Sequence, residues 1–102
     1  MMPPPGSEAR GFIPDAVPGS LTPGELVWGQ PYHFVEVKGR KDLALGGNLE
    51  VMLEYVQQYG GHVELWVRSA KHVEGQTLLT QPLQRRLRTL ADDGKATVKL
   101  YP

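Results

Sequence analysis

Hydrophobic and polar positions alternate with a period of two in two runs of this chain, Tyr32–Lys38 ("YHFVEVK") and His62–Arg68 ("HVELWVR"). This alternation is typical of β-strands, because successive side chains of a strand point to opposite faces of the sheet. In the second run Trp66 is large, so we expect both faces of that strand to be covered and the strand to be central. A third alternating run, Ala96–Tyr101, predicts a strand that closes the sheet.

Two shorter strands are expected upstream of these runs. Leu26–Trp28 is rich in β-forming residues and is separated from Tyr32–Lys38 by Gly29-Gln30-Pro31, which predicts a β-hairpin. Before it, Phe12–Val17 ("FIPDAV") is interpreted as a short strand, followed by a connecting loop rich in proline and glycine.

Helical spacing of apolar residues predicts two helices between the strands. The first spans Leu45 to Tyr59, with Asn48 as the expected N-cap and two glycines as its stop. The second spans about Thr80 to Asp92, with Thr80 as its N-cap. The resulting order of strand, hairpin, helix, strand, helix and strand predicts an α/β fold with a mixed sheet flanked by helices.

The length of 102 residues suits one domain. We interpret residues 1–10 as a flexible, proline-rich lead-in or linker and residues 11–102 as the folded domain. Hydrophobic residues make up 40% and charged residues 22%, which is typical of a globular protein and argues against disorder. Because no signal peptide or membrane helix is recognisable, we expect no membrane partner and a cytoplasmic location, unless the chain is cut from a larger protein.

Charge and cysteine content narrow the chemistry further. The formal net charge is zero, so any nucleic-acid partner must be held by a local basic face. Arg40 and Lys41, beside Lys38, form a basic cluster that suits backbone phosphates and equally an exposed charged loop. The absence of cysteine excludes disulfides, thiolate metal sites and cysteine nucleophiles.

Two carboxylates and a lysine form the strongest candidate site. Asp15 and Glu36 lie in or beside predicted strands, and Lys38 shares a strand face with Glu36. Mg²⁺, or Mn²⁺, prefers oxygen ligands and keeps several waters, so these carboxylates and the backbone carbonyl of Val37 would hold it without enclosing it. The ion would polarise a phosphoryl group, while Lys38 would orient the attacking water or offset charge in the transition state. The pattern therefore indicates metal-assisted hydrolysis.

Pro14-Asp15, followed after about twenty residues by Glu36-Val37-Lys38, resembles the PD-(D/E)xK signature of restriction-endonuclease-like nucleases. The order of elements over about residues 10–102 also resembles the nuclease domains at the C-termini of bacterial polymorphic toxins. The resemblance implies a core of αβββαβ type and Mg²⁺-dependent phosphodiester hydrolysis. It further implies that Asp15 and Glu36 bind the metal and that Lys38 is the catalytic lysine.

The sequence departs from this family at two places. Many members have an N-terminal helix with a further acid, and here only Glu8 in the proline-rich lead-in offers one, so the helix is expected to be missing. Related toxin domains often have Gln-Leu at the start of the helix after the lysine, where this chain has Asn48-Leu49. Asn48 is accordingly an auxiliary site residue or simply a helix cap.

The resemblance implies a biological setting as well. It predicts an endonuclease toxin that is part of a larger secreted effector and acts in the cytoplasm of a target cell, with DNA rather than RNA as the expected substrate. A cognate immunity protein would then be the natural partner. Two alternatives stay open: a non-catalytic structural or protein-binding domain in which Glu36 and Lys38 merely pair, and a housekeeping nuclease for DNA repair or junctions.

Overall fold

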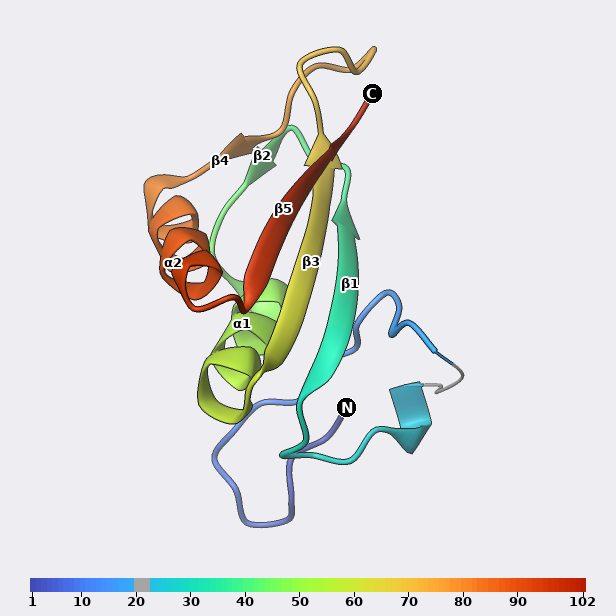
Figure 1. The fold of residues 1–102 in the computed structure, drawn as a ribbon, viewed down its shortest axis with the longest axis vertical. Helices are drawn as coiled ribbons and strands as arrows, with labels where there is room; N and C mark the ends of the chain where they lie inside the picture. The colour runs from blue at the N-terminus through green and yellow to red at the C-terminus, as the bar shows by residue number, and fades with distance from the viewer. Residues whose placement is uncertain (20–22) are drawn as a thin grey trace.

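The computed structural model describes residues 1–19 and 23–102. Strands and helices alternate along the chain, as in an α/β domain (Figure 1), and all strand pairings within these residues are parallel, so the expected mixed sheet is not formed. They are the short 3-10 helix η1 (Pro23–Glu25), β1 (Tyr32–Lys38), β2 (Asp42–Leu43), α1 (Gly47–Tyr59), β3 (Gly61–Arg68), β4 (Leu78–Leu79), α2 (Gln81–Asp92) and β5 (Ala96–Tyr101).

Strands β1, β3 and β5 form a parallel sheet with β3 in the centre. The pairing places Tyr32 beside Gly61 and Lys38 beside Val67, so the strands begin and end at the same levels. Helix α1 connects β1 to β3, and α2 connects β3 to β5, as parallel strands require a crossover. A second, two-stranded parallel sheet is formed by β2 and β4. The predicted central strand and both predicted helices are therefore confirmed.

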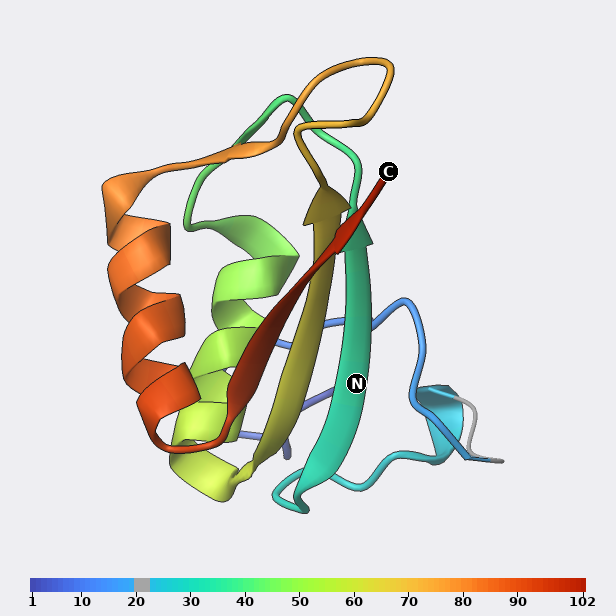
Figure 2. The same ribbon diagram turned by 45° about the horizontal axis from the view of Figure 1, so that its top comes forward.

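Both helices lie on the same face of the three-stranded sheet (Figure 2). The helix-facing side of β1 and β3 is buried, and it packs against the apolar faces of α1 and α2. Alternation along the strands produces this arrangement, because every second residue points toward the helices. The most deeply buried apolar side chains of this core are Phe34, Met52, Leu53, Val56, Val63, Leu65, Leu83 and Leu90.

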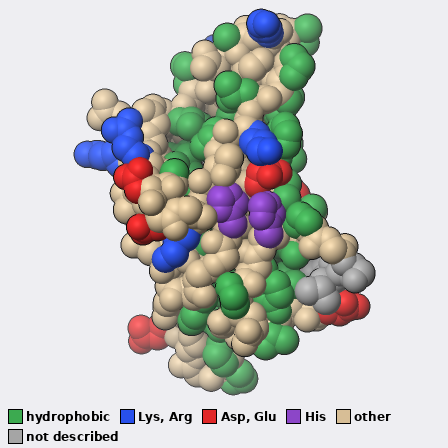
Figure 3. Space-filling model, in the orientation of Figure 1, with side chains coloured by type: hydrophobic (Ala, Val, Ile, Leu, Met, Phe, Trp, Pro, Cys, Tyr) green, Lys and Arg blue, Asp and Glu red, His purple; other side chains and the backbone are tan. Residues whose placement is uncertain are grey.

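The opposite face of the sheet has no helix over it among the described residues, so the prediction that both faces of β3 are covered was wrong. Its side chains instead contact one another. The rings of His33 and His62 stack with centroids 5.1 Å apart, and the indole N–H of Trp66 donates to Glu64 Oε2 at 2.6 Å. Figure 3 shows this face, with the histidines at its middle. The polar network explains how Trp66 remains half-buried without a second helical layer.

The predicted hairpin was wrong, because Leu26–Trp28 forms no strand and β1 pairs with β3 in parallel instead. Trp28 is drawn toward α1, where its indole N–H donates to the hydroxyl of Tyr59 at 3.1 Å. Alternation of hydrophobic and polar residues indicates that a segment is extended, but it does not indicate which other segment pairs with it. The packing of the aromatic ring decides the position of this segment.

The expected strand over Phe12–Val17 is reduced to one antiparallel bridge between Ala16 and Val35. Residues 1–19 contain no helix, and Asn48 is not the N-cap of α1, since Gly46 occupies that position. Thr80 does occupy the N-cap position of α2, as predicted. The structure thus establishes a mixed α/β fold with a parallel sheet and two helices.

Neither helix in residues 1–19 and 23–102 combines the length and the hydrophobicity needed to cross a membrane.

Candidate functional site

The segment with Asp15 is held against the outer edge of β1 by main-chain hydrogen bonds. Ala16 N donates to Val35 O at 3.1 Å, and Val35 N donates to Ala16 O at 2.8 Å. These bonds bring Asp15 next to Glu36 and Val37, although 21 residues separate Asp15 from Glu36 in the chain. The pairing of two extended segments therefore fixes the position of the first candidate carboxylate.

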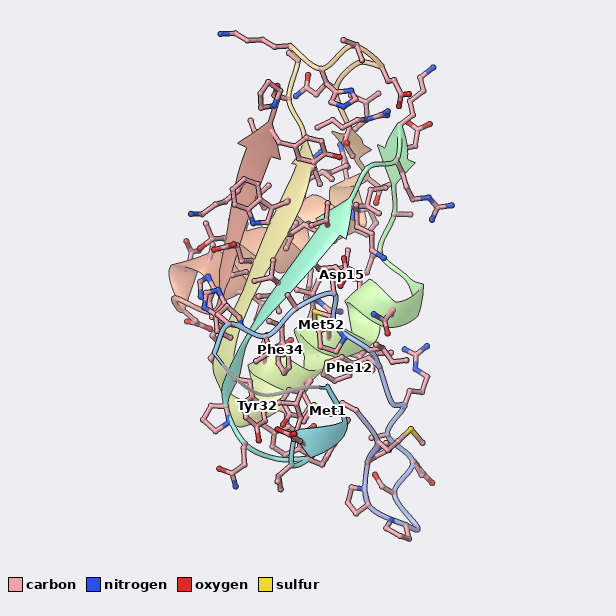
Figure 4. All side chains as sticks on the ribbon, turned by 90° about the vertical axis from the view of Figure 1, so that its right-hand side faces the viewer. Met1, Phe12, Asp15, Tyr32, Phe34 and Met52 are labelled. Atoms are coloured by element: carbon pink, nitrogen blue, oxygen red, sulfur yellow. The ribbon has the colours of Figure 1, made fainter. Side chains whose placement is uncertain are left out.

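An aromatic anchor precedes Asp15 in the same segment. The ring of Phe12 is buried and packs edge-on against Phe34 and Tyr55, with centroids 5.3 Å from each. Figure 4 shows Phe12 between Phe34 and the helix carrying Met52, with Asp15 farther along the same segment. Burial of one aromatic side chain contributes on the order of 2–3 kcal/mol. It thus offsets part of the conformational entropy lost in ordering this otherwise irregular segment, about 1–2 kcal/mol per residue.

Hydrogen bonds join Asp15 directly to β1. The Oδ2 atom of Asp15 accepts from Val37 N at 2.7 Å, and Asp15 N donates to Glu36 Oε1 at 3.0 Å. The two carboxyl groups are therefore fixed relative to each other through the main chain of both segments. Val37, expected to supply a carbonyl ligand, contributes its N–H group to this arrangement.

Glu36 points toward the helices and is only 1% exposed. Its Oε2 atom lies 3.0 Å from Lys38 Nζ, and the Lys38 side chain is 28% exposed. A buried carboxylate is costly unless its oxygens are bonded, and the ammonium of Lys38 and the N–H of Asp15 supply those bonds. The same-face spacing of Glu36 and Lys38 expected from the sequence is confirmed.

Asn48, in the first turn of α1, binds the segment that precedes Asp15. Its Nδ2 donates to Ile13 O at 2.7 Å, and its Oδ1 accepts from Ile13 N at 2.9 Å. The Nδ2 atom also lies 3.5 Å from Glu36 Oε2. Asn48 therefore joins α1, the Asp15 segment and β1, which is a different role from the predicted helix cap.

A pocket of about 260 Å³ opens at the carboxyl end of β1, beside the start of α1. Lys38 and Asn48 both line this pocket, so it gives solvent access to two of the residues that contact Glu36. Ligands of parallel α/β sheets commonly bind at this end of the strands. The complete lining comprises Lys38, Arg40, Leu43, Ala44, Gly46, Gly47, Asn48 and Leu49.

The two predicted basic residues, Arg40 and Lys41, differ in whether they line this pocket. Arg40 is exposed and lines it, whereas Lys41 is exposed and is not among its lining residues. The backbone oxygen of Lys41 accepts from Leu78 N at 2.8 Å, which ties this segment to β4. Only Arg40 is therefore positioned directly beside the candidate site.

The donor set fits a loosely held hard cation better than a caged one. Within residues 1–19 and 23–102, no three His, Asp or Glu side chains are grouped so as to hold a metal ion. Mg²⁺ typically uses one or two carboxylates and keeps several waters, and each carboxylate oxygen can accept more than one contact. Asp15 and Glu36 offer two such carboxylates, but both Glu36 oxygens already have partners, Asp15 N and the ammonium of Lys38, with which a cation would compete.

Sequence reasoning predicted that Asp15, Glu36 and Lys38 lie together, as they do, but missed how Asn48 and Phe12 hold the Asp15 segment. An asparagine in a first helical turn suggests a cap, and only the fold reveals its partner 35 residues away. Comparison of the chain with protein-family models, curated proteins and solved structures gives no match. The functional argument therefore depends on the geometry of this cluster together with the PD-(D/E)xK resemblance.

Proposed function

We propose that this domain is a nuclease that hydrolyses phosphodiester bonds with the help of Mg²⁺ or Mn²⁺. The observation that carries the proposal is the contact of Asp15, Glu36 and Lys38 at the edge of β1. Asp15 N lies 3.0 Å from one Glu36 oxygen, and Lys38 Nζ lies 3.0 Å from the other. These are the three residues that match the PD-(D/E)xK signature.

The finer fold assignment belongs to the same proposal. In a restriction-endonuclease-like core, we expect the segment with the first acid to run antiparallel to the strand with Glu36 and Lys38. The antiparallel bridge of Ala16 to Val35 supports this arrangement, as does the parallel strand β3 that follows α1. The N-terminal helix that many members of the family have finds no counterpart in the described residues, and neither does the hairpin predicted for this chain.

Each residue has a defined role in the proposed reaction. Asp15 and Glu36 would hold the metal ion, with the Val37 carbonyl as the remaining protein ligand. A metal ion held there would polarise the phosphoryl group and lower the pKa of a coordinated water. Lys38 faces the pocket and stabilises negative charge on the pentacovalent phosphorus or orients the attacking water. Arg40, which lines the pocket, would bind a neighbouring backbone phosphate, and Lys41, which does not line it, would bind a phosphate farther along the backbone.

The biological role that we propose follows from the resemblance alone. The domain would be a DNase effector of a bacterial polymorphic toxin, acting in the cytoplasm of a target cell and neutralised in the producer by an immunity protein. RNA is the alternative substrate, and a housekeeping repair or junction nuclease would use the same site in another setting.

A non-catalytic binding domain is the second candidate, and the burial of Glu36 favours it. Both oxygens of this carboxylate already have partners within the chain, Asp15 N and Lys38 Nζ. The same contacts would serve to fasten the N-terminal segment to β1 without any chemistry. The two candidates differ in whether the carboxylates bind a cation.

Activity is tested by incubating supercoiled plasmid and total RNA with the protein, in Mg²⁺ and in chelator. We expect cleavage only with the metal, and a loss on the order of 100-fold or more in Asp15→Asn, Glu36→Gln and Lys38→Ala. Asp42→Asn and Lys71→Ala are matched controls, since both residues are exposed and lie outside the cluster. Equal behaviour of wild type and site variants on both substrates would refute the nuclease proposal.

Cation binding is tested without activity by titrating Mn²⁺ and following its electron paramagnetic resonance signal and the melting temperature. A cation that binds only the native state raises its stability logarithmically once the free cation concentration exceeds the dissociation constant. We expect a rise in wild type and in Asp42→Asn, and none in Asp15→Asn. A wild type that neither binds Mn²⁺ nor is stabilised by it supports the non-catalytic domain.

A further inference from the structure

The outer face of α2 has an excess of positive charge that the proposed active site does not use. Its 12 residues include Arg85, Arg86 and Arg88, and its one acid is the last residue, Asp92. Arg85 and Arg88 are exposed, opposite the buried leucines of the helix. Figure 3 shows Lys and Arg side chains projecting from the upper part of α2. In residues 1–19 and 23–102, no carboxylate lies within ion-pairing distance of these arginines.

Helix stability does not account for this arrangement of charges. Negative charges stabilise the first turn of a helix and positive charges its last turn, but α2 has no acid in the first and no base in the last. Arg85 and Arg88 are three residues apart, so their like charges are neighbours on one face and repel each other. The arginines therefore lower helix stability slightly, and local departures of this kind often mark functional surfaces.

A hollow of about 200 Å³ lies on this face, lined by Gln81, Gln84, Arg85 and Arg88. All four side chains offer N–H donors, and none is acidic or aromatic. Protein interfaces are enriched in aromatic residues and methionine as well as arginine, and this surface offers arginine without any aromatic residue or methionine. The planar guanidinium instead matches the paired oxygens of a phosphate. The lining favours a phosphate backbone over a protein surface as the ligand.

Main-chain contacts connect this face with the candidate site. Strand β4 leads directly into α2 and pairs with β2, as Figures 1 and 2 show. Thr80 N donates to Leu43 O at 3.0 Å, and Gln84 Nε2 donates to Leu79 O at 2.6 Å. Leu43 also lines the pocket beside Lys38. The strands β2 and β4 thus link a residue that lines that pocket to the helix that carries the arginines.

We propose that the arginine face of α2, formed by Gln81, Gln84, Arg85 and Arg88, binds the sugar–phosphate backbone of a nucleic acid at a distance from the bond to be cleaved. The ligand is recognised by its regularly spaced phosphates and not by its bases. The choice of a nucleic acid over other polyanions rests on the proposed nuclease function. The arginines themselves, and not the helix N-terminus, form this interface.

The test measures binding of fluorescent duplex and single-stranded oligonucleotides by anisotropy, in chelator and at several salt concentrations. We expect Arg85→Gln/Arg88→Gln to bind at least about tenfold more weakly, with the slope against log salt smaller by about 1.8 for two lost phosphate contacts. Lys71→Gln/Lys99→Gln removes the same charge elsewhere and should bind like wild type. The melting temperature of the arginine variant should equal or exceed that of wild type, which separates lost binding from lost folding.

Three outcomes would contradict the proposed interface. They are no binding by wild type, binding by the arginine variant as tight as that of wild type, and a loss of binding in the lysine control as large as that in the arginine variant. Loss of binding to immobilised polyglutamate with unchanged oligonucleotide binding would also overturn the interface, because the ligand would then be an acidic protein. Cleavage assays separate the two proposals. If no variant and no wild-type protein cleaves, but binding depends on Arg85 and Arg88, only the nuclease proposal fails.

Discussion

The carboxylate of Glu36 lies on the helix-facing side of β1 with 1% of the residue exposed. An E-x-K pattern on a strand is equally consistent with a solvated edge pair and with a metal ligand beside a lysine. The burial of Glu36 excludes a solvated edge pair, because such a pair would leave both partners in water. Glu36 is the desolvated partner of its ion pair with Lys38. Loss of either residue would leave a polar group without compensation.

Asn48 is expected to matter more for stability than an ordinary helix-surface residue. Asn48→Ala removes two hydrogen bonds to the main chain of Ile13, so the free energy of unfolding should fall by about 1–3 kcal/mol. Urea denaturation measures the change, with the exposed Gln57→Ala on the same helix as control. An equal loss of unfolding free energy in the control would show that the two hydrogen bonds of Asn48 to Ile13 contribute nothing to stability.

Glu64 should make the stability of the protein depend on acid pH. The hydrogen bond from the Trp66 indole holds the pKa of Glu64 below its ordinary value, opposed by desolvation and helped by Lys99 and His33. A carboxyl whose pKa is lower in the folded state stabilises the fold above its unfolded pKa, and this contribution disappears as the pH falls through the folded pKa.

The stability advantage of wild type over Glu64→Gln should therefore be present at neutral pH and vanish on acidification. Unfolding in urea at a series of pH values measures it, with the exposed Glu54→Gln as control. An advantage that stays constant across the whole acid range would contradict the assigned interaction.

At the scale of elements, Gly61 joins α1 to β3 in a conformation that other residues rarely adopt. Its φ is +98°, and a Cβ would lie 2.3 Å from the backbone oxygen of Tyr32, the residue it pairs with in the sheet. Gly61→Ala should cost roughly 2 kcal/mol or more of the free energy of unfolding, through strain and loss of this pairing. Gly24→Ala, which meets no neighbouring atoms, is the control in thermal unfolding. Equal melting temperatures would show that the start of β3 shifts freely.

Periodicity predicted the long elements and failed for the short ones. The helices and the strands β1, β3 and β5 have enough residues for their apolar period to be read. The hairpin prediction failed because Leu26–Trp28 is short, and the packing of Trp28 against Tyr55 and Tyr59 determines its position. Tertiary contacts of one side chain outweigh local β-propensity in such a segment.

The candidate site was predictable only where its residues form a motif. Asp15, Glu36 and Lys38 follow a known order in the sequence, and their contact is present in the structure. The hydrogen bonds of Asn48 to Ile13 depend on which surfaces the fold brings together, and so does the hollow beside Arg85. No spacing along the chain encodes these contacts, because their partners lie in elements far apart in sequence.

At the scale of the whole molecule, zero net charge hides an uneven distribution. Lys38 and Arg40 lie at the pocket, and the arginines of α2 follow beyond β4, whereas Glu64 is enclosed by Trp66 and Lys99 on the uncovered sheet face. A protein of this kind can attract a polyanion locally without any overall positive charge. The global charge is thus a weak argument against nucleic-acid binding.

A toxin role predicts an effect on living cells. Expression in a bacterial cytoplasm without a protecting partner should arrest growth, because chromosomal DNA would be cleaved, and Lys38→Ala should relieve the arrest. Colony counts after induction measure this, with Lys71→Ala as a charge-matched control. Harmless accumulation of folded wild-type protein would count against the toxin role and leave the other proposed settings.

The parallel pairing of β1, β3 and β5 determines the stage of synthesis at which the candidate site can form. No two neighbouring strands of this sheet are adjacent in the chain, so each pairing must close a long loop before it contributes any stability. A ribosome-bound chain that has not yet emerged as far as β3 has no parallel sheet partner for β1, and hence no platform that aligns Glu36 with Lys38. If the proposed nuclease function holds, incompletely synthesised chains would lack the candidate site until β3 has emerged.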